Sequence, residues 1–102
     1  MFYLDPPVKR KGRYSAHLIW YNEAENQYYR HFLQDFASGR LGMPYQWEQK
    51  KGSHLEHYDL IGKAMIAKAI KAGATQVTDG RFRAMLKAKK SQIWPLEAAC
   101  LM

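Results

Sequence analysis

The sequence has one cysteine, Cys100, in 102 residues, so it cannot form an internal disulfide. Small secreted domains usually carry several disulfides. It also has no apolar run near the roughly 18 residues that can span a bilayer, and the apolar residues 1–4 give way to Asp5 too early for a signal peptide. By elimination, we expect a cytoplasmic protein that does not enter a membrane.

Motifs that mark common classes of enzyme are absent as well. There is no P-loop, no G-x-G-x-x-G segment and no serine in a nucleophile elbow. Nothing in the sequence places a histidine or lysine beside Cys100 to activate its thiol, so we interpret Cys100 as a packing residue. The sequence therefore predicts a binding protein rather than an enzyme, with no cofactor.

The chain has four histidines, and two of them, His54 and His57, stand close to Glu56. A helical zinc-protease motif needs histidines at i and i+4 with a glutamate beside the first. Here the spacing is i and i+3, and no third ligand is evident. We therefore predict no metal site. An enzyme that uses His54, Glu56 and His57 remains a third hypothesis, which metal analysis of the purified protein would test.

Few residues are β-branched, whereas Ala, Lys, Leu and Glu are prominent in the second half, which favours helix over sheet. Apolar residues make up 47% and charged residues 25%, as in ordinary globular domains. A chain of this length supports one hydrophobic core. We predict a single α+β domain over residues 1–102, with two or three helices packed on a small antiparallel sheet that contains residues 13–21.

Residues 13–21 alternate with a period of two, which predicts a strand with two different faces. Asn22 is a typical N-cap, and apolar rows at i, i+4 predict a helix from there to Gly39. Residues 39–53 are rich in glycine and are expected to be mostly loop. A short strand within this loop, over residues 44–49, would put its two large aromatic side chains on one face.

A second helix is expected from Ser53 to Gly73. Ser53 and Glu56 match the capping-box pattern, in which the glutamate reaches back to the N–H of the cap residue. Apolar residues at helical spacing follow over several turns. The turn from Gly73 to Thr78 is longer than the three or four residues of a helix-turn-helix motif, so we assign no such motif.

After a short strand over residues 74–78, the sequence leaves two alternatives open. One is a hairpin that turns at Asp79-Gly80, and the other is a helix over residues 79–90 capped by Thr78 or Asp79. We favour the helix slightly, because residues 81–90 contain no β-branched residue. The tail over residues 91–102 is expected to pack on the body of the domain.

Positive charge is the main functional signal. The chain has sixteen Lys and Arg against nine Asp and Glu, a formal net charge of +7. One cluster contains Arg81, Arg83, Lys87, Lys89 and Lys90. The other lies on an expected proline-containing loop or arm over residues 5–13 and contains Lys9, Arg10, Lys11 and Arg13. Such clusters neutralise phosphates. We predict a small, non-catalytic nucleic-acid-binding or regulatory protein with DNA or RNA as its partner.

A protein-interaction module, such as a small inhibitor or adaptor, is the alternative. Aromatic residues make up 14% of the chain, and Tyr, Trp and Arg dominate the hot spots of protein interfaces. We take Tyr45, Trp47 and Trp94 as the expected anchors. A pull-down that survives nuclease treatment would favour this alternative over nucleic-acid binding.

Overall fold

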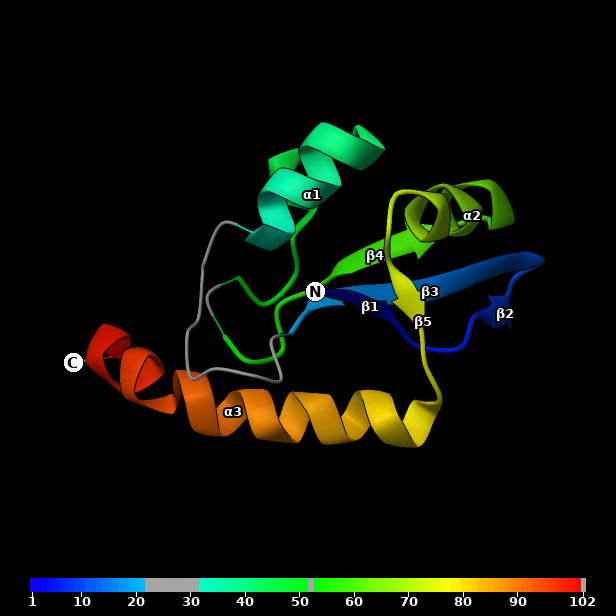
Figure 1. The fold of residues 1–102 in the computed structure, drawn as a ribbon. Helices are drawn as coiled ribbons and strands as arrows, with labels where there is room; N and C mark the ends of the chain where they lie inside the picture. The colour runs from blue at the N-terminus through cyan, green and yellow to red at the C-terminus, as the bar shows by residue number, and fades with distance from the viewer. Residues whose placement is uncertain (22–31, 52, 102) are drawn as a thin grey trace.

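Three layers make up the protein in its computed structural model, which describes residues 1–21, 32–51 and 53–101, the stretch 91–101 by its backbone alone (Figure 1). The elements are β1 (Phe2–Leu4), β2 (Val8–Arg10), β3 (Arg13–Trp20), α1 (Phe32–Leu41), the 3-10 helix η1 (Tyr45–Trp47), β4 (Tyr58–Ile61), α2 (Lys63–Lys71), β5 (Thr75–Gln76) and α3 (Asp79–Leu101). Within the described residues, three α-helices pack on a five-stranded sheet, which confirms the predicted α+β domain.

The sheet is built around β3, its longest strand. β1 and β2 both pair antiparallel with β3, and β4 pairs antiparallel with its other edge. β5 pairs parallel with β1, so the sheet is mixed rather than wholly antiparallel as expected.

In no part of the described chain is a helix both long enough and apolar enough to cross a membrane.

The two faces of the sheet carry separate hydrophobic clusters. Alternate residues of β3, such as Leu18 and Trp20, pack with α1 and α2 on one face. Their neighbours, such as Ile19, pack with Phe82 and Met85 of α3 on the other. Figure 1 shows α1 and α2 on one side of the sheet and α3 on the opposite side. The period of two in β3 therefore sets the three layers, because side chains alternate between faces along a strand.

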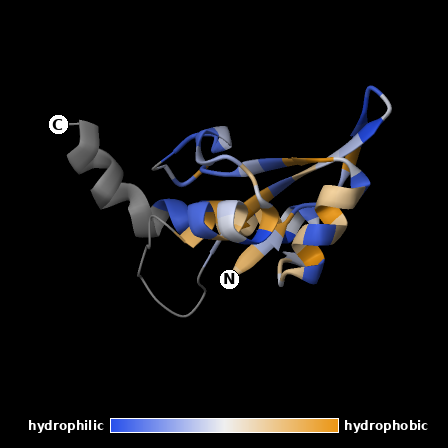
Figure 2. Ribbon diagram, turned by 90° about the horizontal axis from the view of Figure 1, so that it is seen from above, coloured by the Kyte–Doolittle hydropathy of each residue, from blue (hydrophilic) through white to orange (hydrophobic). Residues whose placement is uncertain are grey.

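The expected loop or arm over residues 5–13 is instead largely a β-hairpin. β2 pairs with β3 through an Arg10–Arg13 register, and Lys11 and Gly12 form the two-residue turn. Their φ angles are 51° and 80°, as a turn that follows the twist of the strands requires. Figure 2 shows the tip of this hairpin in the blue of hydrophilic residues.

A bulge separates β1 from β2. The pairing stops at Leu4 opposite Leu18 and resumes at Val8 opposite Ser15, so three residues on one strand face two on the other. Pro6 and Pro7 stand in the bulge, where their lack of an N–H costs no ladder hydrogen bond.

The helix expected from Ser53 to Gly73 is wrong in its first half. Residues 58–61 form β4, and the helix begins after Gly62. The φ of Gly62 is 95°, and this residue forms the turn between the strand and the helix. The Ser53 hydroxyl accepts the Leu55 N–H at 3.1 Å and donates to the Lys50 carbonyl at 2.7 Å, so it stabilises a turn and not a helix start. Pairing with β3 outweighs the local capping pattern. The end of the helix near Gly73, with φ of 117°, is as predicted.

Two predictions in the middle of the chain also need correction. α1 does not end at Gly39 but continues to Leu41, and Gly42 ends it with a φ of 71°. Residues 45–47 form η1 and not a strand. The first part of the expected helix, residues 22–31, lies outside the described residues.

Of the two alternatives after β5, the structure has the helix, but it continues to Leu101 and does not end at residue 90 as predicted. The Thr78 hydroxyl accepts the Arg81 N–H at 3.2 Å, and its carbonyl accepts the Phe82 N–H at 2.9 Å, so of the two predicted caps, Thr78 and Asp79, it is Thr78 that caps α3. β5 lies between α2 and α3 and pairs with β1, which agrees with assigning no helix-turn-helix motif.

Candidate metal centre

The register of β3 and β4 brings polar side chains together on the face of the sheet that α3 covers in part. His17 stands directly opposite Asp59, and His57 lies two residues before Asp59. Side chains two residues apart on an extended chain share a face, so the three side chains meet. They remain open to solvent, with exposed fractions of 49% for His17, 21% for His57 and 44% for Asp59.

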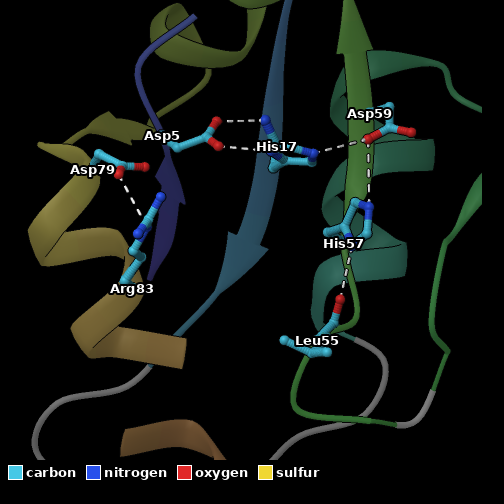
Figure 3. A network of polar contacts seen from close by, with 7 residues as sticks. All are labelled: Asp5, His17, Leu55, His57, Asp59, Asp79 and Arg83. Atoms are coloured by element: carbon cyan, nitrogen blue, oxygen red, sulfur yellow. Dashed lines mark hydrogen bonds and ion pairs between the residues drawn. The ribbon is translucent and has the colours of Figure 1, made fainter. Parts of the chain in front are cut away.

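Both imidazole rings direct the same nitrogen at one carboxylate oxygen (Figure 3). Nε2 of His17 lies 3.6 Å from Oδ1 of Asp59, and Nε2 of His57 lies 3.4 Å from the same atom. The two rings stand nearly perpendicular, with an interplanar angle of 84° and centroids 5.0 Å apart. One potential ligand atom from each of the three residues lies within 4.8 Å of the other two.

The opposite nitrogen of each ring already has a partner. Nδ1 of His17 lies 2.6 Å from Oδ2 of Asp5, whose Oδ1 also accepts the His17 amide at 2.7 Å. Nδ1 of His57 lies 2.7 Å from the Leu55 carbonyl. A carbonyl oxygen only accepts hydrogen bonds, so Nδ1 of His57 carries the proton and Nε2 of the neutral ring keeps its lone pair.

The bulge therefore has a direct role in the site. It places Asp5 where one carboxylate holds both the backbone and the ring of His17. This hydrogen bond raises the pKa of His17 above its ordinary value of 6.5, with burial acting in the opposite direction. The negative charges of Asp5 and Asp59 raise the same pKa further, and Arg10 lowers it. A proton and a metal ion would compete for Nε2 of His17.

Two hollows of similar size adjoin His17. The one toward α3 has a volume of about 200 Å³ and an almost wholly apolar lining that includes Ile19, Phe82 and Leu86, with Lys50 as its one Lys or Arg. The one toward the hairpin has a volume of about 190 Å³ and includes Arg10. His17 lines both hollows, so a ligand on the centre can extend to either side.

Residues 2–89 match the family described as "Protein of unknown function (DUF4031)". The chain belongs to the DUF4031 family. In this DUF4031 chain, the match includes Asp5, His17, His57 and Asp59. Neither the curated proteins nor the solved structures give a match to the chain.

The basic clusters predicted from the sequence are exposed, with one exception. Lys89 is 1% exposed and its Nζ lies 3.4 Å from Oε1 of Glu56, so its assignment as a phosphate contact is wrong. Its position on the apolar face of α3, together with Phe82 and Met85, is the physical reason. Arg83 is exposed and forms an ion pair with Asp79 at 3.0 Å.

The other predicted phosphate contacts remain at the surface. They are Lys9, Arg10, Lys11, Arg13, Arg81, Lys87 and Lys90. Tyr45 and Trp47 are also exposed, as interaction anchors must be, whereas the side chain of Trp94 lies outside the described part of the chain. Both partner assignments stay predictions.

Sequence reasoning missed the centre because it placed His57 and Asp59 on a helix. Glu56, expected in a capping box and in the third hypothesis, is buried against Lys89 and does not belong to the group. The signal that could have found the site is the alternation over residues 57–60, in which Tyr58 and Leu60 are buried. That period of two predicts a strand with His57 and Asp59 on its other face.

Proposed function

We propose that the protein binds a divalent transition-metal ion through His17, His57 and Asp59. The observation that supports this is the convergence of two imidazole Nε2 atoms on one carboxylate oxygen. Two histidines and one carboxylate form the ligand set of many zinc and non-haem iron sites, and three protein ligands leave positions open for water or substrate. An ion there would polarise a bound oxygen atom and lower the pKa of a bound water.

The spacing of the ligand atoms fits such an ion. With bonds of 2.0–2.1 Å, neighbouring ligands of a tetrahedral zinc ion lie about 3.3 Å apart. The two distances to Oδ1 of Asp59 are 3.4 and 3.6 Å. The ligand atoms of the two histidines lie within 4.8 Å of each other, so the rings must turn toward each other for the shell to close.

The outer hydrogen bonds fit as well. Histidines that bind metals usually donate their other N–H to a carboxylate or a backbone carbonyl, which fixes the orientation of the ring. Asp5 serves His17 in this way, and the Leu55 carbonyl serves His57. Both rings are thus oriented before the ion arrives.

The test is a titration of chelator-treated protein with Zn²⁺ and with Co²⁺, whose visible absorption reports its coordination. We expect one ion per chain and an intense cobalt spectrum, since three protein ligands favour low coordination numbers. Loss of a residue that holds a metal ligand typically weakens metal binding by about 10–100-fold. Loss of a ligand itself should have at least that effect, so His17→Asn, His57→Asn and Asp59→Asn should each weaken binding more than about tenfold.

His54→Asn is the matched control, because His54 is a nearby histidine outside the group. It should leave the affinity unchanged. A folded wild-type protein that takes up neither ion would refute the proposal, as would equal losses in the His54 and His57 variants.

A further inference from the structure

Two elements near the proposed metal centre, the β2–β3 hairpin and the start of α3, carry basic residues at one end of the molecule. Between residues 8 and 13, the β2–β3 hairpin has four basic residues and no acidic one. Figure 1 places this hairpin and the first turns of α3 at the same end. α3 contributes the exposed Arg81 and Lys87 there, whereas the exposed Arg83 is paired with Asp79. The hairpin and α3 therefore both present cations at this end of the molecule.

The cations also line the hollows beside the centre. Arg10 lines one hollow together with the carboxylates of Asp5 and Asp59, Lys50 lines the other, and His17 borders both. An anion bound at the centre would have a long, flexible cation on each side. A ligand with three successive anionic groups would bring the outer two toward Arg10 and Lys50 if the middle one were held on the ion.

The hollow toward α3 adds a different requirement. Its lining is almost wholly apolar, apart from the charge that Lys50 brings. A ligand that suits it has an apolar, compact group next to an anionic one. A nucleotide has this combination, because its base offers an apolar face and its phosphate a charge.

We infer that the centre binds a single nucleic-acid strand, with a phosphate oxygen at the position left open by His17, His57 and Asp59 and the adjoining phosphates near Arg10 and Lys50. This inference rests on the proposed metal function. A single strand fits better than a duplex, because a base enters the apolar hollow only when it is out of the stack.

The experiment measures fluorescence anisotropy of a labelled twelve-nucleotide oligo(dT) with zinc-loaded protein and with chelator-treated protein. We expect the loaded protein to bind at least about tenfold more tightly, and to bind the single strand more tightly than a twelve-base-pair duplex or an oligoglutamate peptide. Binding should weaken with rising salt, as phosphate contacts require.

Arg10→Gln and Lys50→Gln should each reduce the salt slope by about one, the effect expected for one lost phosphate contact. Lys71→Gln removes the same charge from an exposed position on α2, across the sheet, and should leave the slope unchanged. All three variants should bind one zinc ion as the wild type does.

The outcomes separate the two proposals. If zinc binds but the strand binds equally with and without it, or if the Lys71 variant matches the Arg10 variant, the strand inference is wrong and the metal function stands. Tighter binding of oligoglutamate also overturns it, in favour of an acidic protein partner. If no zinc binds, both proposals fail.

Discussion

The buried ion pair between Lys89 and Glu56 gives the sharpest test of the fold. Both side chains are 1% exposed and their charged atoms lie 3.4 Å apart, so solvent does not screen the pair. Burial lowers the pKa of Lys89, while the charge of Glu56 acts to keep the lysine protonated. Lys89→Met leaves the Glu56 carboxylate buried without this cation. Breaking a buried pair in this way costs about 3–5 kcal/mol.

Thermal unfolding followed by circular dichroism measures this loss. For a domain of this length, 1 kcal/mol corresponds to about 4–8 °C, so we expect Tm to fall by roughly 12–40 °C. Lys87→Met and Lys90→Met are the controls, because both lysines are exposed on the same helix and should change stability by less than about 0.5 kcal/mol.

A double variant, Lys89→Met with Glu56→Gln, keeps the test informative if the single variant fails to fold. Removing both charges restores most of the stability, because a neutral pair of similar volume avoids the cost of burying charge. If Lys89→Met melts like Lys87→Met, the pair does not form. Lys89 then returns to the surface cluster in which the sequence had placed it.

Three further predictions concern the site and the helix ends. In metal-free protein, Asp5→Asn should lower the pKa of His17 in an NMR titration, because Asp5 raises it. The raised pKa of His17 stabilises the folded state fully below pH 6.5, and this stabilisation is lost as the pH rises through the pKa of His17 in the folded protein. The Tm difference between wild type and variant should therefore shrink across that pH range. An unchanged titration curve of His17 in the variant would contradict the role of Asp5. Burial raises the pKa of Glu48 above 4.5, because it disfavours the charged carboxylate. Glu48→Gln should therefore raise Tm at pH 7 and should lose this advantage below pH 4.5, where the wild-type carboxyl is protonated in both states. Equal Tm values of wild type and variant at pH 7 would refute the reasoning. Gly42→Ala should cost about 1 kcal/mol in urea unfolding because its φ is 71°, whereas Gly39→Ala inside α1 should stabilise, and the reverse order would mean that α1 ends at Gly39.

The sequence predicted β3, the Thr78 cap and the two or three helices because these depend on local patterns. It missed β4 because Tyr58 and Leu60 satisfy a helical apolar face as well as a strand face, and only pairing with β3 decides between them. The proposed metal centre depends on that same pairing, which places His17 opposite Asp59, forty-two positions later. A spacing motif cannot report ligands that come from two segments far apart in the sequence.

The bulge at Pro6 and Pro7 also affects whether two copies of the protein can pair through the exposed edge of the sheet. Within the described residues, no strand pairs with the outer edge of β2, and such edges invite pairing between copies of a protein. Here two prolines interrupt that edge, and Lys9, Arg10 and Lys11 place like charges along it. Neighbouring copies repel each other at this edge. The charge assigned to holding a nucleic-acid strand therefore also opposes edge-to-edge aggregation.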